Sequence, residues 1–372
     1  MNKNVDTKEL NGQLVKSTPA VWLLVIGMLL TFIAISCNED EPTIIDPIKP
    51  GKRDYVWSID SVDYQNRPRL MRFESIWGSS PMDIWGVVPD AVDDFDDLWH
   101  FDGEKWLRAT NIPPLTDATN DIILYATWGT SKNDVWAFGN KNFQNKWGAC
   151  ILHFDGTGWA NATPENIVDL KSVLFNVYGK GKNDIWVGGS EYALHYDGNN
   201  WVSYFIEDSM VVSSITSSRN NIYLTAYNAY GSNVRKLFRL VDNEFYAVDS
   251  TTFTTYKFGS NLWATTSSLK SLANGIISTT IASDGKIDTS RWKRELTTNY
   301  FLLQKFIQSP KNIFVVGQGA HVYHYNGSDW KEIFISVPNH VIDPNTSLLG
   351  VWTDGSEVFF SDRLNGIVYH GR

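Results

Sequence analysis

One pattern of residues recurs along most of this chain and limits what it can fold into. The clearest copy, at 181–201, reads GKNDIWVGGSEYALHYDGNNW, and two more read SIWGSSPMDIWGV with WHFDGEKW and ATWGTSKNDVWAF with LHFDGTGW. A fourth copy reads SPKNIFVVG and then YHYNGSDW. The copies follow one another at about 40 to 50 residues, a period typical of proteins built from stacked supersecondary units.

Within each copy, short apolar or aromatic runs alternate with turn residues such as Asp-Gly, Asn-Gly and Lys-Asn-Asp. This arrangement predicts short strands joined by hairpins, with no helical period between them. We therefore expect an all-β protein, a β-propeller in which each copy forms one four-stranded blade. Two weaker copies at 211–249 and 253–294 and a partial last copy bring the expected count to seven, with six or eight as alternatives.

The last copy indicates how the ring would close. It reads GVWTDGSEVFFSD and then GIVYHGR, and it stops where a fourth strand should begin. The segment DYVWSI at 54–59 has an aromatic start and no inner strands of its own. We expect this N-terminal strand to complete the last blade, because a closed ring leaves no sheet edge exposed to aggregation.

The residues before the repeats predict export and a lipid anchor. A polar start with three lysines leads into the apolar run VWLLVIGMLLTFIAIS, which is typical of a secretory signal and short for a membrane span. The letters AISC, ending at Cys37, resemble a bacterial lipobox. This resemblance implies that Cys37 is lipidated and becomes the mature N-terminus, and an uncleaved anchor helix is the alternative.

These features divide the chain into a lipoprotein signal peptide at 1–36, a flexible acidic and Pro-rich tether at 37–53, and a propeller at 54–372. The residues NEDEP after Cys37 resemble the export tag of some Gram-negative lipoproteins. The resemblance implies an outer-membrane lipoprotein that is exposed on the cell surface. An ordinary acidic tether is the alternative.

Charge and cysteine usage narrow the partners. The formal net charge of −9 disfavours nucleic acid and anionic surfaces, so the expected contacts are the membrane through the lipid and a glycan or envelope protein. The sequence has two cysteines, and once Cys37 is lipidated there is no disulfide framework. We expect Cys150 to be a small core residue.

Most aromatic and polar residues of the motif recur at blade-equivalent positions, which predicts a structural role. We expect most of the sixteen tryptophans to pack between blades, although aromatic faces also bind sugars. The recurring aspartates should accept local hydrogen bonds in turns. Each recurring histidine should bind a turn or strand in its own blade, since radial symmetry keeps them too far apart to share a metal. The histidines are His100, His153, His195, His324 and His370, and the aspartates are Asp83, Asp134, Asp184, Asp102, Asp155 and Asp197.

From Arg72 to the end, the repeat resembles secreted bacterial propellers with the motifs Trp-Gly-Ser/Thr-x-x-Asn-Asp-Ile/Val-Trp and His-Tyr-Asp-Gly-x-x-Trp. More distantly, Asp-Gly-x-x-Trp is similar to the Asp-box of sialidase propellers, but it lacks the Ser and one spacing residue. Gly188 and Gly189, followed by Tyr196 and Trp201, are similar to a Kelch repeat. These resemblances imply an architecture and no particular activity.

Propeller topology predicts where a binding site would lie. Loops between strands two and three, and between blades, emerge on one face, and here they are long: 89–97, 107–121, 140–148, 226–233 and 331–347. We call this the long-loop face, and we expect a glycan or protein to bind there, because binding residues collect on long loops of a rigid scaffold. Its candidate ligand-binding residues are Phe143, Trp147, Tyr227, Tyr230, Arg235 and His340.

An acidic loop on the same face is a weak candidate for Ca²⁺, which prefers several carboxylate oxygens. Its spacing matches no EF-hand loop, so a solvated acidic run is the alternative, and no other cofactor is expected. The acidic residues are Asp90, Asp93, Asp94, Asp96 and Asp97.

The motifs contain no recognisable nucleophile with its base, which favours a non-catalytic binding or scaffold module. The alternative is a polysaccharide-active enzyme of glycoside hydrolase or lyase type. A hydrolase needs two carboxyl groups about 5 to 10 Å apart in a cleft. Glu74, Asp121 and Glu357 lie near predicted inner strands, but their spacing pairs none of them.

Overall fold

The computed structural model describes residues 50–61, 72–89, 98–109, 122–143, 146–168, 170–218, 221–230, 235–251, 253–258, 261–266, 274–364 and 366–372. The signal segment, Cys37 and the acidic loop fall outside these ranges. Within them, no helix has the length and apolar character needed to cross a membrane.

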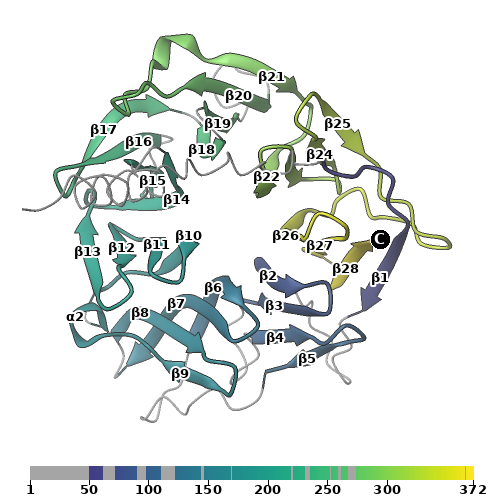
Figure 1. The fold of residues 1–372 in the computed structure, drawn as a ribbon, viewed down its shortest axis with the longest axis horizontal. Coiled ribbons are helices and arrows are strands. Elements are labelled where there is room, and N and C mark those ends of the chain that lie inside the picture. The colour runs from purple at the N-terminus through teal and green to yellow at the C-terminus, as the bar shows by residue number, and fades with distance from the viewer. Residues whose placement is uncertain are drawn as a thin grey trace, which may run out of the picture. The chain divides into compact units, whose positions relative to one another are not determined.

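The described residues form seven four-stranded antiparallel sheets arranged as blades of a ring (Figure 1). Blade 1 holds β2 (Ser75–Ser80), β3 (Asp83–Val87), β4 (Leu98–Phe101) and β5 (Trp106–Arg108). Blade 2 holds β6 (Ile122–Ser131), β7 (Asp134–Phe143), β8 (Lys146–Phe154) and β9 (Trp159–Asn161). Blade 3 holds β10 (Leu174–Gly181), β11 (Asp184–Gly189), β12 (Tyr192–Tyr196) and β13 (Trp201–Phe205).

The remaining blades follow the same order. Blade 4 holds β14 (Met210–Ser218), β15 (Asn221–Asn228), β16 (Arg235–Val241) and β17 (Glu244–Thr251). Blade 5 holds β18 (Phe253–Phe258), β19 (Asn261–Thr266), β20 (Gly275–Thr280) and β21 (Lys293–Thr297). Blade 6 holds β22 (Leu302–Ser309), β23 (Asn312–Gly317), β24 (Val322–Tyr325) and β25 (Trp330–Ile333). Blade 7 holds β26 (Leu348–Thr353), β27 (Val358–Asp362), β28 (Ile367–Gly371) and β1 (Trp57–Ser61).

This architecture confirms the predicted seven-bladed β-propeller. The first strand of each blade lies nearest the centre of the ring in Figure 1, and the short helices α2 (Glu165–Val168) and η1 (Thr289–Arg291) lie in connections between strands. Second strands such as β11 and β23 are buried on both faces, because a blade packs against a neighbour on each side. Their apolar residues therefore run nearly without interruption.

The core between blades consists largely of the recurring aromatic residues. Trp136, Phe138 and Trp201 are buried together between blades 2 and 3, and their rings lie 5.9 to 6.4 Å apart. Cys150 is buried too, as predicted. Trp77 and Trp128, in contrast, line the centre of the ring as well as packing against the core.

The recurring histidines bind their own blades, as predicted. Nε2 of His153 donates to Oδ1 of Asp134 at 2.8 Å while the imidazole stacks on Trp136 at 4.0 Å. Blades 1 and 3 repeat this contact between histidine and aspartate at 2.6 and 2.9 Å. Burial would raise the pKa of Asp83, but hydrogen bonds from His100 and Ser79 outweigh it and hold this pKa below its usual value.

The aspartates of the motif divide into two kinds. Asp102, Asp155 and Asp197 accept backbone N–H groups from residues two and three positions later, as predicted. The next residue is a glycine with φ between +93° and +96°, a left-handed conformation in which glycine avoids strain. Asp83, Asp134 and Asp184 instead accept hydrogen bonds from side chains, so they hold strands together rather than a single turn.

The N-terminal strand closes the ring. β1 (purple) pairs antiparallel with β28 (yellow), from Trp57↔Gly371 to Ser61↔Ile367, and Asp60 accepts a hydrogen bond from Nδ1 of buried His370 at 3.0 Å (Figure 1). This confirms the predicted closure, with a strand that begins three residues later than expected. The residues before β1 also reach blade 6, where Arg53 bonds Asp329 at 2.9 Å.

One predicted loop is wrong. Residues 140–148 belong mostly to β7 and β8, which stay paired as far as Asn142↔Trp147 and Phe143↔Lys146. The backbone ladder between β7 and β8 therefore continues past the end of the repeat motif. Blade 2 thus keeps β7 and β8 paired as far as Phe143↔Lys146.

Candidate functional site

One cavity of the described residues lies at the centre of the propeller, and we call it the channel. It has a volume of about 670 Å³, within the range typical of ligand sites. The first strands of blades 1, 2, 3, 4, 6 and 7 contribute its wall, and the described lining combines aromatic, aliphatic and polar side chains. Inner strands therefore build the described wall of this site.

A β-bulge near the start of the inner strands shapes the mouth of this channel on the long-loop face. In β6 the pairing shifts between Leu124 and Ala126, and in β10 it shifts between Leu174 and Asn176. The extra residue of a bulge leaves the ladder, and its side chain turns in a new direction. Here the extra residues are Tyr125 and Phe175, whose rings meet edge to face at 4.9 Å in the channel wall.

Glu74 occupies the equivalent position in blade 1. Its backbone N–H donates to the carbonyl of Val87 at 3.0 Å, and its side chain lines the channel beside the aromatic pair of blades 2 and 3. Burial raises the pKa of the Glu74 carboxyl, although Arg72 at 3.8 Å and Arg363 oppose the rise. The mouth thus combines two aromatic rings with an acid that is protonated more readily than an exposed glutamate.

Lys305 extends across the interior of the channel. It belongs to β22 in blade 6, and its Nζ donates to Oγ of Ser214 in blade 4 at 3.1 Å, past the intervening blade 5. Burial lowers the pKa of this amine to about 8. Among the described lining residues Lys305 is the basic side chain and Glu74 is the acidic one. Perturbed ionisable groups in a cavity are typical of binding and catalytic sites.

Other polar groups of the wall join neighbouring blades. Nδ2 of Asn176 donates to the carbonyl of Val212 at 2.7 Å, and the Tyr178 hydroxyl lies 3.0 Å from that of Ser217. Between blades 1 and 2, the N–H of Thr127 donates to Oγ of Ser75 at 3.2 Å. These bonds fix the distances between inner strands, so the width of the channel is set before a ligand enters.

The residues predicted from the loops lie on several blades. Trp147 lies in the β7–β8 hairpin of blade 2 and is 39% exposed, whereas Tyr230 lies in the β15–β16 turn of blade 4 and is 84% exposed. The guanidinium of Arg235 lies 5.5 Å from the ring of Tyr227, so the structure brings these two together. Burial lowers the pKa of Arg235.

The other predicted residues lie apart from this pair. His340 is in the segment between β25 and β26, and its Nε2 lies 3.4 Å from the Tyr369 hydroxyl. Phe143 ends β7, but its side chain is outside the described part of the chain. The possible Ca²⁺ loop, with Asp90, Asp93, Asp94, Asp96 and Asp97, is also outside it. Within the described ranges, no three His, Cys, Asp or Glu side chains gather closely enough to hold a metal ion.

Three carboxylates were predicted as possible catalytic groups, and the structure separates the two that it describes. Glu74 lines the channel, whereas Glu357 bonds Nε2 of His370 in blade 7 and lies 3.7 Å from Nε of Arg372. Asp121 is outside the described residues.

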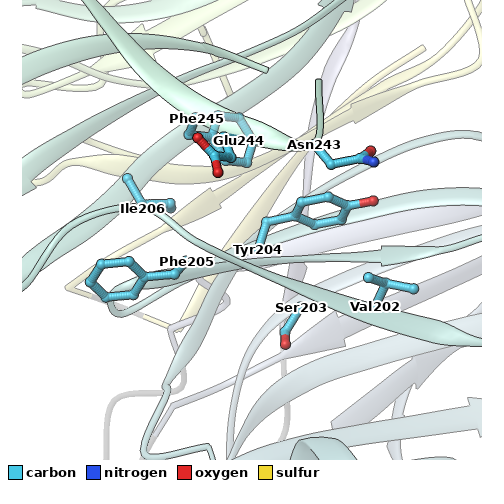
Figure 2. A pocket seen from close by; sticks show the side chains of 8 residues that line it. All are labelled: Val202, Ser203, Tyr204, Phe205, Ile206, Asn243, Glu244 and Phe245. Atoms are coloured by element: carbon cyan, nitrogen blue, oxygen red, sulfur yellow. The ribbon is translucent and has the colours of Figure 1, made fainter. Parts of the chain in front are cut away.

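A second cavity lies at the outer rim, between blades 3 and 4. It measures about 550 Å³ and is lined by β13 and the start of β17, as Figure 2 shows. Val202 and Phe205 are 42% and 51% exposed there, and Glu244 also lines the cavity. Its lining combines apolar side chains with the polar side chains of Ser203, Tyr204, Asn243 and Glu244.

Sequence reasoning missed Lys305, Tyr125 and Phe175. The pairing of β22 with β23 places Lys305 at a position filled in other blades by Ile76, Thr127, Val177, Ile215 and Val351. A single lysine at a position that is otherwise aliphatic or threonine was the available signal. The aromatic pair had no such signal, because a bulge adds a residue that a strict alternation does not anticipate.

Comparison with known proteins supports the fold. No protein-family model and no curated protein matches the sequence. Among solved structures, YCF48 bound to D1 peptide has a TM-score of 0.58 at 14% identity, covering 87% of this chain and 99% of that one. The extracellular domain of a proposed hybrid two-component system from B. thetaiotaomicron has a TM-score of 0.58 at 11% identity, covering 85% and 42%. A GH74 xyloglucanase from Xanthomonas campestris has a TM-score of 0.54 at 11% identity, covering 84% and 53%.

These similarities, together with the seven sheets, define the class of the chain as a seven-bladed β-propeller. At such low identity they concern the fold alone. The three neighbours differ in what their names describe, namely a peptide complex, an extracellular domain and a glycoside hydrolase. Function therefore has to be argued from the channel itself.

Proposed function

We propose that this chain is a non-catalytic binding module, held at the cell surface by a lipid on Cys37, that captures a glycan or an envelope protein at the central channel. The observation that carries the proposal is the channel of about 670 Å³, with an aromatic pair at its mouth and an amine in its interior. Hydrogen bonds between blades fix its width, and a preformed site loses little conformational entropy on binding.

The proposed location rests on the sequence. The apolar run, the lipobox-like letters before Cys37 and the acidic residues after it favour an exported lipoprotein of the outer membrane. One structural neighbour is itself named as an extracellular domain, which agrees with this location.

A test of the binding role compares the channel with the outer loops. The domain from Gly51 to Arg372 is screened on a glycan array and in pull-downs from envelope extracts. Two double variants are used: Tyr125→Ala with Phe175→Ala at the channel mouth, and Trp147→Ala with Tyr230→Ala on the outer loops. Tyr246→Ala serves as the matched control, because this tyrosine is 51% exposed on the outer strand β17.

Loss of binding in the channel variant alone supports the proposal. Loss in the loop variant alone moves the site to the β7–β8 hairpin and the blade 4 turn, as the sequence predicted. Release of reducing sugar from a polysaccharide, abolished by Glu74→Gln while binding persists, contradicts the non-catalytic role and favours the glycoside hydrolase alternative.

The anchor is tested separately in cells. Metabolic labelling with a fatty acid should mark the wild-type chain and leave Cys37→Ser unlabelled, and protease added to intact cells should degrade the labelled protein. Labelled protein that is protected in intact cells contradicts surface exposure but not lipidation.

A further inference from the structure

Another cavity lies between blades 2 and 3, and we call it the α2 cavity. It has a volume of about 790 Å³, within the range typical of ligand sites. Strands of both blades contribute to its described lining, together with the connection that contains α2, which lies at the outer edge of the ring in Figure 1. It shares no described lining residue with the channel, so the two cavities are separate sites.

An aromatic cluster forms part of the α2 cavity. The ring centroids of Trp136, Tyr196 and Trp201 lie 5.1 to 5.9 Å apart. Both tryptophans are buried, whereas Tyr196 is partly exposed. At the equivalent place between blades 1 and 2, Phe154 takes the position of Tyr196. This cluster therefore belongs to the scaffold, and the residues around it distinguish the α2 cavity.

Two asparagines line this cavity from the turn between β12 and β13. The backbone N–H groups of Asn199 and Asn200 donate to Oδ1 of Asp197 at 2.8 and 2.7 Å, and both residues are exposed. Because these bonds use the backbone, the turn does not require amide side chains. The equivalent positions hold Glu104 and Lys105 in blade 1, Thr157 and Gly158 in blade 2, and Ser328 and Asp329 in blade 6.

Two more asparagines line it from the end of β9 and from α2. Asn161 and Asn166 are both exposed, and Nδ2 of Asn166 donates to the carbonyl of Trp201 at 3.4 Å, which joins α2 to blade 3. The described lining contains these four amides and no Asp, Glu, Lys or Arg, whereas the cavity in Figure 2 includes Glu244. In a chain of which 20% is charged, such a lining favours a neutral ligand.

The chemistry of this lining suits a sugar. A carboxamide has both donors and an acceptor, as a sugar hydroxyl does, and the C–H faces of a sugar ring suit an aromatic surface. His153 also lines the cavity, and its Nε2 is bound to Asp134 at 2.8 Å. A charged ligand would lose hydration here without an oppositely charged Asp, Glu, Lys or Arg in the described lining, which is unfavourable.

We infer that the α2 cavity binds a neutral oligosaccharide through the amides of Asn161, Asn166, Asn199 and Asn200. Hydroxyls of the sugar exchange hydrogen bonds with these amides, and its apolar face contacts Tyr196. The inference goes beyond the proposed function, because it places a glycan at a site that is separate from the channel.

The test is a glycan array of neutral and acidic oligosaccharides, probed with the full chain in detergent. The neutral oligosaccharide that binds most strongly is then titrated by isothermal titration calorimetry at pH 7. Asn199→Ala with Asn200→Ala should weaken its binding at least tenfold, and Asn161→Ala in blade 2 should weaken it as well. Glu104→Ala with Lys105→Ala changes the same two turn positions in blade 1 and leaves the net charge unaltered, so this control should bind as the wild type does.

The channel variant, Tyr125→Ala with Phe175→Ala, distinguishes the two sites and should retain the neutral oligosaccharide. The inference is overturned if no neutral oligosaccharide binds, if only acidic ones bind, or if binding survives the asparagine changes. Loss in the channel variant with normal binding in the asparagine variants also overturns it and leaves the proposed function standing. Because the turn keeps its backbone bonds to Asp197, the variant of Asn199 and Asn200 should unfold at the wild-type temperature in circular dichroism, which separates loss of binding from loss of fold.

Discussion

Replacing Lys305 by methionine should stabilise the protein at neutral pH. The amine has an ordinary pKa of 10.5 and a folded-state pKa of about 8. This difference corresponds to a cost of about 3 kcal/mol for keeping the folded-state ammonium charged. Methionine has a similar length and no charge, and loss of the bond to Ser214 offsets about 1 kcal/mol. The free energy of unfolding should thus rise by about 2 kcal/mol at pH 7.

The difference in stability between the wild type and Lys305→Met should change with pH in one direction. Below pH 8 the lysine is protonated in both states, so the wild type carries the full cost. Between pH 8 and 10.5 the unfolded chain binds a proton that the folded chain has released, so wild-type stability rises relative to the variant. Above pH 10.5 both states are neutral and the electrostatic advantage of methionine disappears.

Urea unfolding of both proteins at pH 7 and pH 10 measures this difference. Lys331→Met is the control, because an exposed lysine contributes about 0 to 1 kcal/mol in its ion pair. A variant that is less stable than the wild type at pH 7, or a difference that is the same at both pH values, would refute the reasoning that burial of the charge dominates at this site.

Three further predictions concern the scaffold. His370→Ala removes the contact with Asp60 at 3.0 Å, so it should lower the free energy of unfolding by about 1 to 3 kcal/mol. Limited proteolysis of this variant should begin near β1, and cleavage that begins elsewhere would contradict the prediction. Gly198→Ala, at φ +95° and with a Cβ 2.7 Å from Asn183, should cost roughly 1 to 3 kcal/mol in thermal unfolding, and an unchanged midpoint would count against strain there. Burial and the positive charge of Arg53 lower the pKa of His324 to about 4, so its NMR signal should shift only near pH 4, and a transition near pH 6.5 would show an exposed ring.

The sequence predicts the blades well because their signal is repeated. The histidine and tryptophan positions recur in several copies, and each copy confirms the register of the others. Blade 5, which holds β18 to β21, corresponds to a degenerate copy of the repeat. The sequence still predicts this blade, because a closed ring needs one more blade between the copies on either side of it. The 140–148 segment was predicted wrongly, since its continued pairing depends on backbone bonds that no residue pattern encodes.

The candidate site was predicted less well than the fold. Trp147 and Tyr230 were chosen because they depart from the repeat, and departures were sought in loops. Lys305 departs from it within a strand, and the repeat motif of blade 6 begins only at Ser309, so the sequence gives no register for the inner strand before it. Tyr125 and Phe175 depend on a shift of register, which becomes visible only when the paired strands are placed.

Ring closure also sets the order in which this protein can mature. Asp60 and His370, 310 residues apart in sequence, meet in blade 7, and contacts of such separation are slow to form. In the export that we propose, the N-terminus crosses the membrane first, so β1 has no partner until β28 has emerged. During that interval an unpaired strand is exposed, and such strands readily join other chains. The proposed export would therefore benefit from a chaperone that protects β1, a requirement that follows from topology rather than from the stability of the finished ring.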